Sequence, residues 1–141
     1  SKEMSELPVG KGVLRRRTQA GKGRRVAVLA FGSMVRPSLG AGEKLDATVA
    51  DMRFVKPIDV ELIVELATTH DLVVTVEENV IMGGAGSAVI EVMAQHSIAT
   101  PVLQLGLPDR FVDQGDPGIQ LKACGLTEDG ILQSIQARLG G

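Results

Sequence analysis

The sequence predicts an α/β fold: a three-layer α/β/α sandwich in which helices cover both faces of a mostly parallel sheet of about five strands. Short β-branched runs alternate with amphipathic segments of helical length, which is the pattern of parallel crossover units. Runs such as residues 25–31 (RVAVLAF) are apolar throughout, as expected for strands buried on both faces. The first strand is followed by only a short turn, whereas a parallel crossover needs a dozen residues or more. We therefore expect this strand to run antiparallel at or near an edge of the sheet.

Each element follows from local signals. Strands are predicted at residues 12–16, 25–31, 47–52, 71–76 and 100–105. Helices are predicted at residues 37–45, 60–69 and 87–95, with a short helix after Asp116-Pro117 and a last helix from Thr127 that ends before Gly140. Asp59 is the expected N-cap of the second helix, whose apolar residues at 62, 63 and 66 share one face. Turn residues at 20–23 indicate that residues 15–25 form an exposed hairpin.

Composition limits the classes of function. The 141 residues suffice for one core, and we expect residues 1–9 to be a lead-in and residues 10–141 one domain. Three Phe and no Trp or Tyr leave no aromatic platform for bases or sugars, which argues against single-stranded nucleic acid and lectin binding. The single cysteine, Cys124, excludes an internal disulfide, suits a cytoplasmic location and fits a small buried hydrophobe better than a nucleophile. No apolar run is long enough for a membrane span. The first residues hold no initiator Met and no secretory signal, so we expect a piece of a longer protein.

The charge is unevenly distributed. Residues 1–25 contain eight Lys or Arg against two Glu, while the rest of the chain is acidic. A basic arm can bind nucleic acid or anionic lipid. Because only a few charges cluster and none lies on an amphipathic helix, solvated charges on an exposed hairpin are the favoured interpretation.

Four loops follow the carboxyl ends of the predicted parallel strands, the edge at which such sheets bind ligands. They begin at Gly32, Arg53, Glu77 and Gly106. Glu77 and Glu78 are neighbours on a strand and point to opposite faces, so they are not an acid/base pair. We expect one to face solvent and the other to accept hydrogen bonds from a loop or neighbouring domain. The candidate anion or interface contacts are Arg53, Phe54, Lys56, Glu77, Glu78, Asn79, Gly83, Gly84, Gly86, Ser87, Asp109 and Arg110.

The glycines of residues 83–86 have two interpretations. Glycines before a helix let backbone N–H groups approach an anion, but the loop is neither G-x-G-x-x-G nor a Walker loop. The favoured alternative is a tight turn with close packing of the helix on the sheet. Phe54 between Arg53 and Lys56 is balanced between an exposed partner anchor and a core residue. No His or Cys lies at metal-ligand spacing and no serine has a G-x-S-x-G setting, so the chain holds no self-sufficient active site.

Three stretches of the sequence carry a resemblance to a known protein family. They are residues 51–59 (DMRFVKPID), 74–87 (VTVEENVIMGGAGS) and 105–111 (LGLPDRF). They closely resemble the C-terminal domain of the 1-deoxy-D-xylulose-5-phosphate synthase family, within the transketolase superfamily. The resemblance runs from about Leu7 to Leu139, and Gly125-Leu126-Thr127 is similar to the family's tail. It implies a five-stranded mixed sheet with one antiparallel strand, in agreement with the prediction made from the residues.

The same resemblance implies an enzyme that condenses pyruvate with glyceraldehyde 3-phosphate, loses CO2, and uses thiamine diphosphate and Mg2+. Its product would feed isoprenoid, thiamine and pyridoxal synthesis. The family's cofactor and substrate residues belong to N-terminal and middle domains, so the resemblance implies no catalytic, cofactor-binding or metal-binding residue here. The implied partners are those two domains and a second subunit of a homodimer, with no nucleic acid and no membrane.

The favoured hypothesis is that the chain is an assembly domain of such a synthase and is inactive by itself. Two alternatives remain. One is an anion-binding regulatory module that uses the helix start at residues 83–87. The other is the C-terminal domain of a 2-oxo-acid dehydrogenase β subunit, against which residues 53–59 and the Gly-Leu-Pro-Asp loop argue. For the chain by itself we expect weak dimerization or none.

Overall fold

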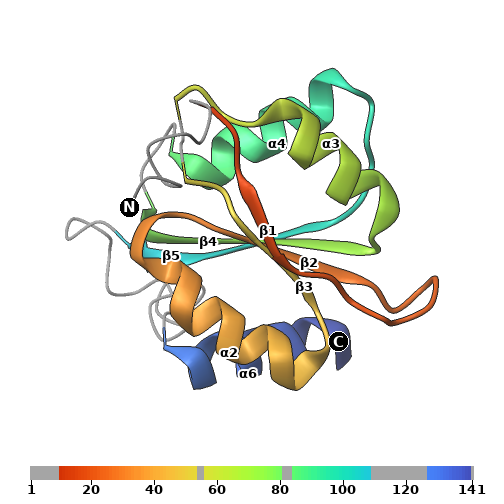
Figure 1. Cartoon of the computed structure of the whole chain (residues 1–141), viewed down its shortest axis with the longest axis vertical. Coiled ribbons are helices and arrows are strands. Elements are labelled where there is room, and N and C mark those ends of the chain that lie inside the picture. The colour runs from red at the N-terminus through yellow and green to blue at the C-terminus, as the bar shows by residue number, and fades with distance from the viewer. Residues whose placement is uncertain (1–9, 54–55, 81–83, 109–126, 141) are drawn as a thin grey trace, which may run out of the picture.

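The computed structural model describes residues 10–53, 56–80, 84–108 and 127–140, and the statements below concern these residues. Helices lie on both faces of a central sheet, giving the three layers seen in Figure 1. The predicted α/β/α architecture is therefore confirmed.

The sheet holds five strands in the order β1-β3-β2-β4-β5. The strands are β1 (Val13–Arg16), β2 (Val26–Ala30), β3 (Thr48–Asp51), β4 (Leu72–Val80) and β5 (Val102–Pro108). The pairs β2–β3, β2–β4 and β4–β5 are parallel, whereas β1 runs antiparallel to β3 at one edge. The prediction of one antiparallel edge strand is confirmed. The strand β4 continues four residues past its predicted end, so Glu77 and Glu78 lie on the strand and not in a loop.

The predicted hairpin is wrong. β1 pairs with β3, with Val13 opposite Asp51, and not with the strand that follows it in sequence. The reason is burial: all five residues of β2 are buried, so β2 takes the centre of the sheet, with β3 and β4 as parallel neighbours.

The expectation that the basic residues before β2 are solvated is also not met by all of them. The Arg16 guanidinium donates to the carbonyls of Gly42 and Ala47 and to Asp46 Oδ1, which fixes the end of the following helix.

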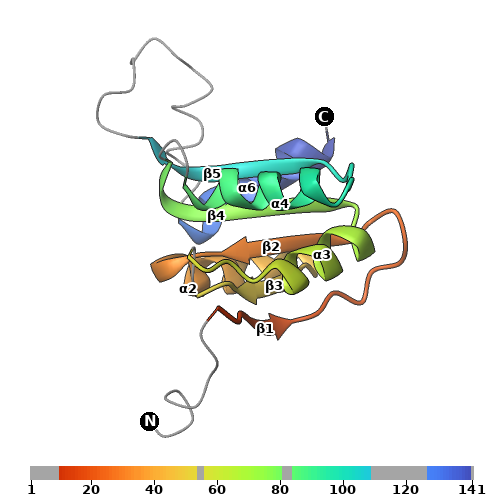
Figure 2. The ribbon, with the colours of Figure 1, turned by 90° about the horizontal axis from the view of Figure 1, so that it is seen from above.

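The described helices cover both faces of the sheet (Figures 1 and 2). The helices α3 (Val60–Thr69) and α4 (Ala85–Gln95) lie on one face, and α2 (Val35–Leu45) and α6 (Glu128–Gly140) on the other, with a short 3-10 turn, η1 (Gly32–Met34), before α2. Pro37 lies in the first turn of α2, as predicted. α4 begins two residues before its predicted start, and α6 includes Gly140. The predicted helix after Asp116-Pro117, and Cys124, lie outside the described residues.

The core consists of two apolar layers. Ala27, Leu29 and Val73 point toward α3 and α4, where they pack with Ile63, Leu66 and Val89. Val28, Val49 and Val74 point toward α2 and α6, where they pack with Ala41, Ile131 and Ile135. Aliphatic side chains fill both layers almost alone, in keeping with the low aromatic content. Among the described helices, none is long and apolar enough to cross a membrane.

Asp59 caps α3 as predicted and also anchors the chain before β1. Its Oδ1 accepts a hydrogen bond from the Leu62 N–H at 3.1 Å, and its Oδ2 accepts from the Gly12 N–H at 2.8 Å. The carboxylate is buried. One side chain therefore holds the start of α3 against the start of β1.

Candidate functional site

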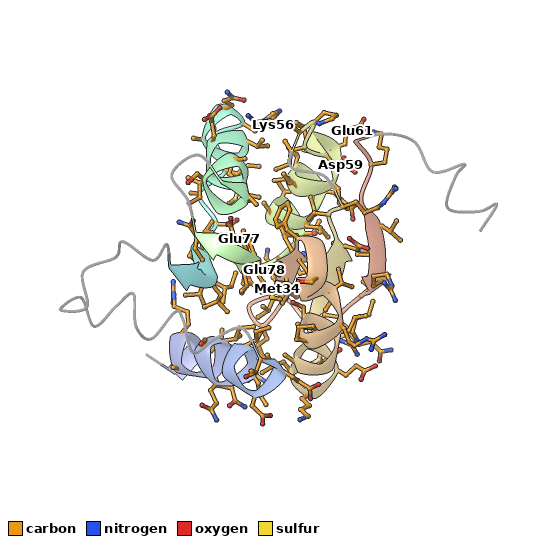
Figure 3. All side chains as sticks on the ribbon, turned by 90° about the vertical axis from the view of Figure 1, so that its left-hand side faces the viewer. Met34, Lys56, Asp59, Glu61, Glu77 and Glu78 are labelled. Carbon is orange, nitrogen blue, oxygen red and sulfur yellow. The ribbon has the colours of Figure 1, made fainter. Side chains whose placement is uncertain are left out.

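The candidate contacts gather where the parallel strands end. The carboxyl ends of β2, β3, β4 and β5 lie at one edge of the sheet, because these strands run in the same direction. Figure 3 shows this edge, with Met34, Glu77 and Glu78 near its centre and Lys56, Asp59 and Glu61 toward α3 and α4. We call the described part of this edge, residues 31–34, 51–53, 56–59, 77–80 and 84–86, the carboxyl edge.

Glu77 is the most buried charged side chain of the carboxyl edge after Asp59, with 9% of its surface exposed. Its two carboxylate oxygens accept the backbone N–H groups of Ala85 at 3.2 Å and Gly86 at 2.6 Å. These N–H groups lie in the first turn of α4, where no partner exists within the helix and the helix dipole is positive. The chain's own carboxylate thus takes the position in which an anion at this helix start would bind.

Glu78 points the other way. Its side chain is exposed, and its Oε1 accepts a hydrogen bond from Ser33 Oγ at 2.7 Å. This bond connects β4 to η1, so it joins the ends of two neighbouring strands. The prediction that one of the two glutamates faces solvent is confirmed for Glu78. Glu77 does accept backbone hydrogen bonds, but from the first turn of α4 and not from a loop.

Gly86 lies where α4 packs closely on the sheet. A methyl group added at its Cα would overlap Gln104 Oε1 and would lie 3.0 Å from both Glu77 Oε2 and Thr75 Oγ1. Thr75 Oγ1 is fully buried and has no hydrogen-bond partner among the described residues. These contacts support the interpretation in which this glycine lets the helix approach the sheet.

The two cations of the loop after β3, Arg53 and Lys56, differ in their contacts. Arg53 adopts a left-handed conformation with φ of 62°. Its backbone N–H donates to Asp51 Oδ1 at 3.1 Å, and its Nη1 donates to the Lys11 carbonyl at 3.2 Å, toward the chain before β1. Lys56 is exposed and forms no ion pair within the described part of the chain. Phe54 lies outside the described residues, so its role remains a prediction.

An ion pair flanks this loop. Lys11 Nζ lies 2.6 Å from Glu61 Oε1, and both side chains are exposed. The hydrogen bond to Glu61, together with the charge of that carboxylate, raises the pKa of Lys11 above its ordinary value. Lys11, Glu61 and Asp59 thus place one positive and two negative charges near one another on the β1 side of the carboxyl edge.

The remaining candidates are scattered. Gly84 is the half-buried N-cap of α4, and Ser87 is exposed in its first turn. The backbone of Asn79 pairs with Leu107. Gly83, Asp109 and Arg110 lie outside the described residues.

Sequence reasoning missed Ser33 as a contact. The signal was present, because Ser33 follows β2 and Glu78 lies near the end of β4, and parallel neighbours bring their carboxyl ends together. Reading the pair from the sequence would have required knowing that β2 and β4 are adjacent.

Within the described ranges, no group of three or more His, Cys, Asp or Glu side chains is placed to hold a metal ion. The N–H groups at the start of α4, which could otherwise hold a phosphate group, are taken by the Glu77 carboxylate. No reaction step is assigned to the described residues.

Comparisons with known proteins agree with the fold described above. Residues 16–131 match the family described as transketolase, C-terminal domain. The chain belongs to this family. Among solved structures, this transketolase C-terminal domain resembles "Split gene transketolase, inactive beta4 tetramer", with a TM-score of 0.72 and 35% sequence identity over 93% of this chain and 42% of that chain.

Two curated relatives of this transketolase C-terminal domain are 1-deoxy-D-xylulose-5-phosphate synthases. The protein of Burkholderia thailandensis (strain ATCC 700388 / DSM 13276 / CCUG 48851 / CIP 106301 / E264) is 63% identical over 137 residues. The protein of Burkholderia pseudomallei (strain 668) is 61% identical over 137 residues. Each alignment covers 97% of this chain but 22% of the relative, so the chain spans about a fifth of the length of these relatives.

Proposed function

We propose that this chain is the C-terminal domain of a 1-deoxy-D-xylulose-5-phosphate synthase, a thiamine-diphosphate-dependent transferase. The observation that carries this proposal is an identity of 61–63% to two such synthases over 97% of the chain. The intact enzyme would join pyruvate to glyceraldehyde 3-phosphate with loss of CO2, in the cytoplasm, and supply isoprenoid, thiamine and pyridoxal synthesis.

Within that enzyme the domain would serve assembly, and the other domains would hold thiamine diphosphate and Mg2+. Support comes from the carboxyl edge, whose charged groups are used to fix backbone or lie exposed. Glu77 caps α4, Asp59 caps α3, and Glu78 and Lys56 face outward. The candidate partners are the N-terminal and middle domains of the same polypeptide and the second subunit of a homodimer. The carboxyl edge would supply the contacts.

The anion-binding alternative at residues 83–87 is less favoured. An anion there would compete with the Glu77 carboxylate for the N–H groups of Ala85 and Gly86. It would also bring a second negative charge against a buried first one, which is costly.

A domain replacement tests the proposal. The matching 137 residues of the Burkholderia thailandensis synthase are replaced by this chain. We expect the chimera to form 1-deoxy-D-xylulose 5-phosphate from pyruvate and glyceraldehyde 3-phosphate with thiamine diphosphate and Mg2+, and the chain alone to form none. Turnover by the chain alone, or a folded chimera without activity, contradicts the proposal.

The assembly role has its own test in the same chimera. Glu78→Lys reverses an exposed charge of the carboxyl edge, and Glu91→Lys reverses an exposed charge on α4, away from that edge. We expect Glu78→Lys to weaken subunit association in sedimentation and to lower activity, while Glu91→Lys leaves both unchanged. Equal behaviour of the two variants would remove the carboxyl edge as the contact surface.

A further inference from the structure

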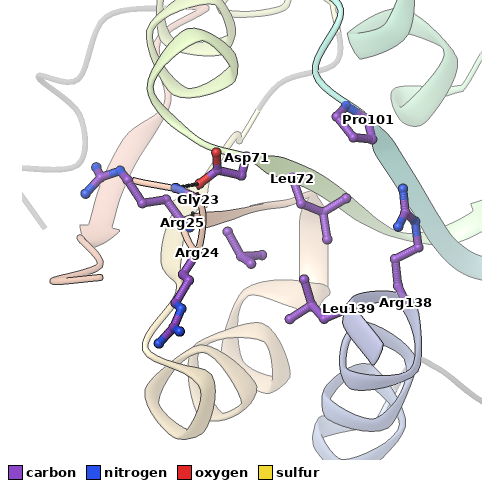
Figure 4. Close-up of a pocket in the computed structure, with 9 residues that line it drawn as sticks. Gly23, Arg24, Arg25, Asp71, Leu72, Pro101, Arg138 and Leu139 are labelled. Carbon is purple, nitrogen blue, oxygen red and sulfur yellow. Dashed lines mark hydrogen bonds between the residues drawn. The ribbon is translucent and has the colours of Figure 1, made fainter. Parts of the chain in front are cut away.

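The opposite edge of the sheet, where the parallel strands begin, carries a hollow of about 190 Å3. That volume corresponds to roughly six water molecules at liquid density, so it suits a small ligand only. The first residues of β2 and β4 and the last turn of α6 meet here (Figure 4). The lining residues are Gly23, Arg24, Arg25, Val26, Asp71, Leu72, Pro101, Arg138 and Leu139.

The charges around the hollow are not balanced. Among the described residues that line it, Asp71 is the one acidic residue, and the Asp71 Oδ2 atom accepts the N–H groups of Gly23 and Arg25, both at 2.8 Å. The Arg25 guanidinium is also engaged: its Nε donates to the Thr69 carbonyl and its Nη1 to the Ala20 carbonyl. Among the described residues, Arg24 and Arg138 form no ion pair or side-chain hydrogen bond. Two cations therefore remain available at one hollow.

This placement accounts for one more cation of the basic run in residues 1–25. Arg16 and Arg17 pair with Asp46 and Glu65, and Arg25 holds carbonyl oxygens. Arg24 has no such use, and the fold brings it to the same hollow as Arg138, which comes from the other end of the chain. Chain segments far apart in sequence thus contribute one cation each.

The two cations stand apart. In Figure 4 the side chains of Arg24 and Arg138 lie on opposite sides of an apolar floor that includes Leu72 and Leu139. A short molecule with an anionic group at each end and methylene groups between can contact both guanidinium groups while its middle lies on the floor.

We propose that this hollow, with Arg24 and Arg138 at its two sides, binds small dianions whose charged ends are separated by a short apolar spacer. Guanidinium groups pair well with both carboxylate and phosphorus oxyanions, so the shared chemistry is the pair of oxyanions. The site is distinct from the carboxyl edge and goes beyond the assembly function. Because both arginines are exposed, the affinity is modest, with a Kd of about 1 mM at low salt.

The experiment is a titration of the 15N-labelled 141-residue chain, followed by amide NMR at constant ionic strength. The dianions are glutarate for carboxylates and propane-1,3-diphosphonate for phosphorus oxyanions, and butyrate and inorganic phosphate are the single-headed comparators. We expect saturable shifts at Gly23, Arg24, Leu72 and Leu139 with at least one dianion. Single-headed anions should bind about fivefold more weakly or worse.

Two variants and one control decide the assignment. Arg24→Gln and Arg138→Gln should each weaken dianion binding about fivefold and leave the rest of the spectrum in place. Arg15→Gln removes the same charge from an exposed residue of the basic run that does not line the hollow, and should leave binding unchanged. No saturable shifts, shifts confined to residues 84–87, or equal losses in all three variants would overturn the proposal.

Discussion

The carboxylate of Glu77 allows a sharp test of how α4 is held on the sheet. Glu77→Ala removes the acceptor of two buried N–H groups, those of Ala85 and Gly86. The neighbouring change Glu78→Ala removes one exposed hydrogen bond, to Ser33. The two substitutions delete the same atoms and the same charge one residue apart, so the difference between them isolates the contact with the helix start.

The magnitude follows from the two distances. A bond of 2.6 Å to a charged oxygen is short and strong, and its loss leaves a buried donor unpaired, at about 2 kcal/mol. The bond of 3.2 Å is at the long end and contributes about 1 kcal/mol. We therefore expect Glu77→Ala to lower the free energy of unfolding by about 3 kcal/mol. The exposed Glu78→Ala should change it by less than about 0.5 kcal/mol.

The assay is urea unfolding followed by circular dichroism. With a slope of about 2 kcal/mol per molar urea, the midpoint should fall by about 1.5 M for Glu77→Ala and by less than about 0.25 M for Glu78→Ala. Glu77→Gln keeps one acceptor oxygen and should fall between them. Equal midpoints for the two alanine variants, at unchanged slope, would refute the role of Glu77 as the cap of α4.

Three further changes test other parts of the fold. Gly86→Ala should destabilise by about 1–3 kcal/mol through overpacking against Gln104 in thermal unfolding, whereas Gly21→Ala, with open space around it, should be neutral or slightly stabilising. Asp59→Ala should cost about 2 kcal/mol in urea unfolding because two N–H groups lose their acceptor, and Asp59→Asn should cost less. Burial lowers the pKa of His70 below its ordinary value of 6.5, so the stability that its neutral form contributes is present above that pH and declines as the pH falls through the lowered pKa. His70→Asn should therefore flatten the fall of stability that begins as the pH drops below 6.5, and a wild-type slope in this variant would contradict the assignment.

The local signals in the sequence predicted most elements because each rests on neighbouring residues. The apolar run at 25–31 became the fully buried β2, and Asp59 capped α3 through its own side chain. The opposite directions of Glu77 and Glu78 follow from the strand repeat alone. None of these predictions requires knowledge of what lies across the sheet.

Pairings between distant residues could not be predicted in the same way. The strand β1 was expected beside β2 because the turn between them is short, yet the burial of β2 places it between β3 and β4. His70 is another case. Its Nε2 lies 2.6 Å from Thr48 Oγ1, which also accepts the Thr18 N–H, so three segments meet at one buried hydroxyl. Only the sheet order brings these residues together.

The antiparallel direction of β1 has a consequence for how a longer polypeptide is threaded. Because Val13 lies opposite Asp51, the last residue of β3, the described chain comes into the sheet beside the carboxyl edge and not at the far side. In the proposed synthase, the covalent tether to the preceding domain would therefore reach this domain at the surface proposed for contact. A tether attached next to an interface keeps the two surfaces at high effective concentration, so even individually weak contacts can keep the domain docked.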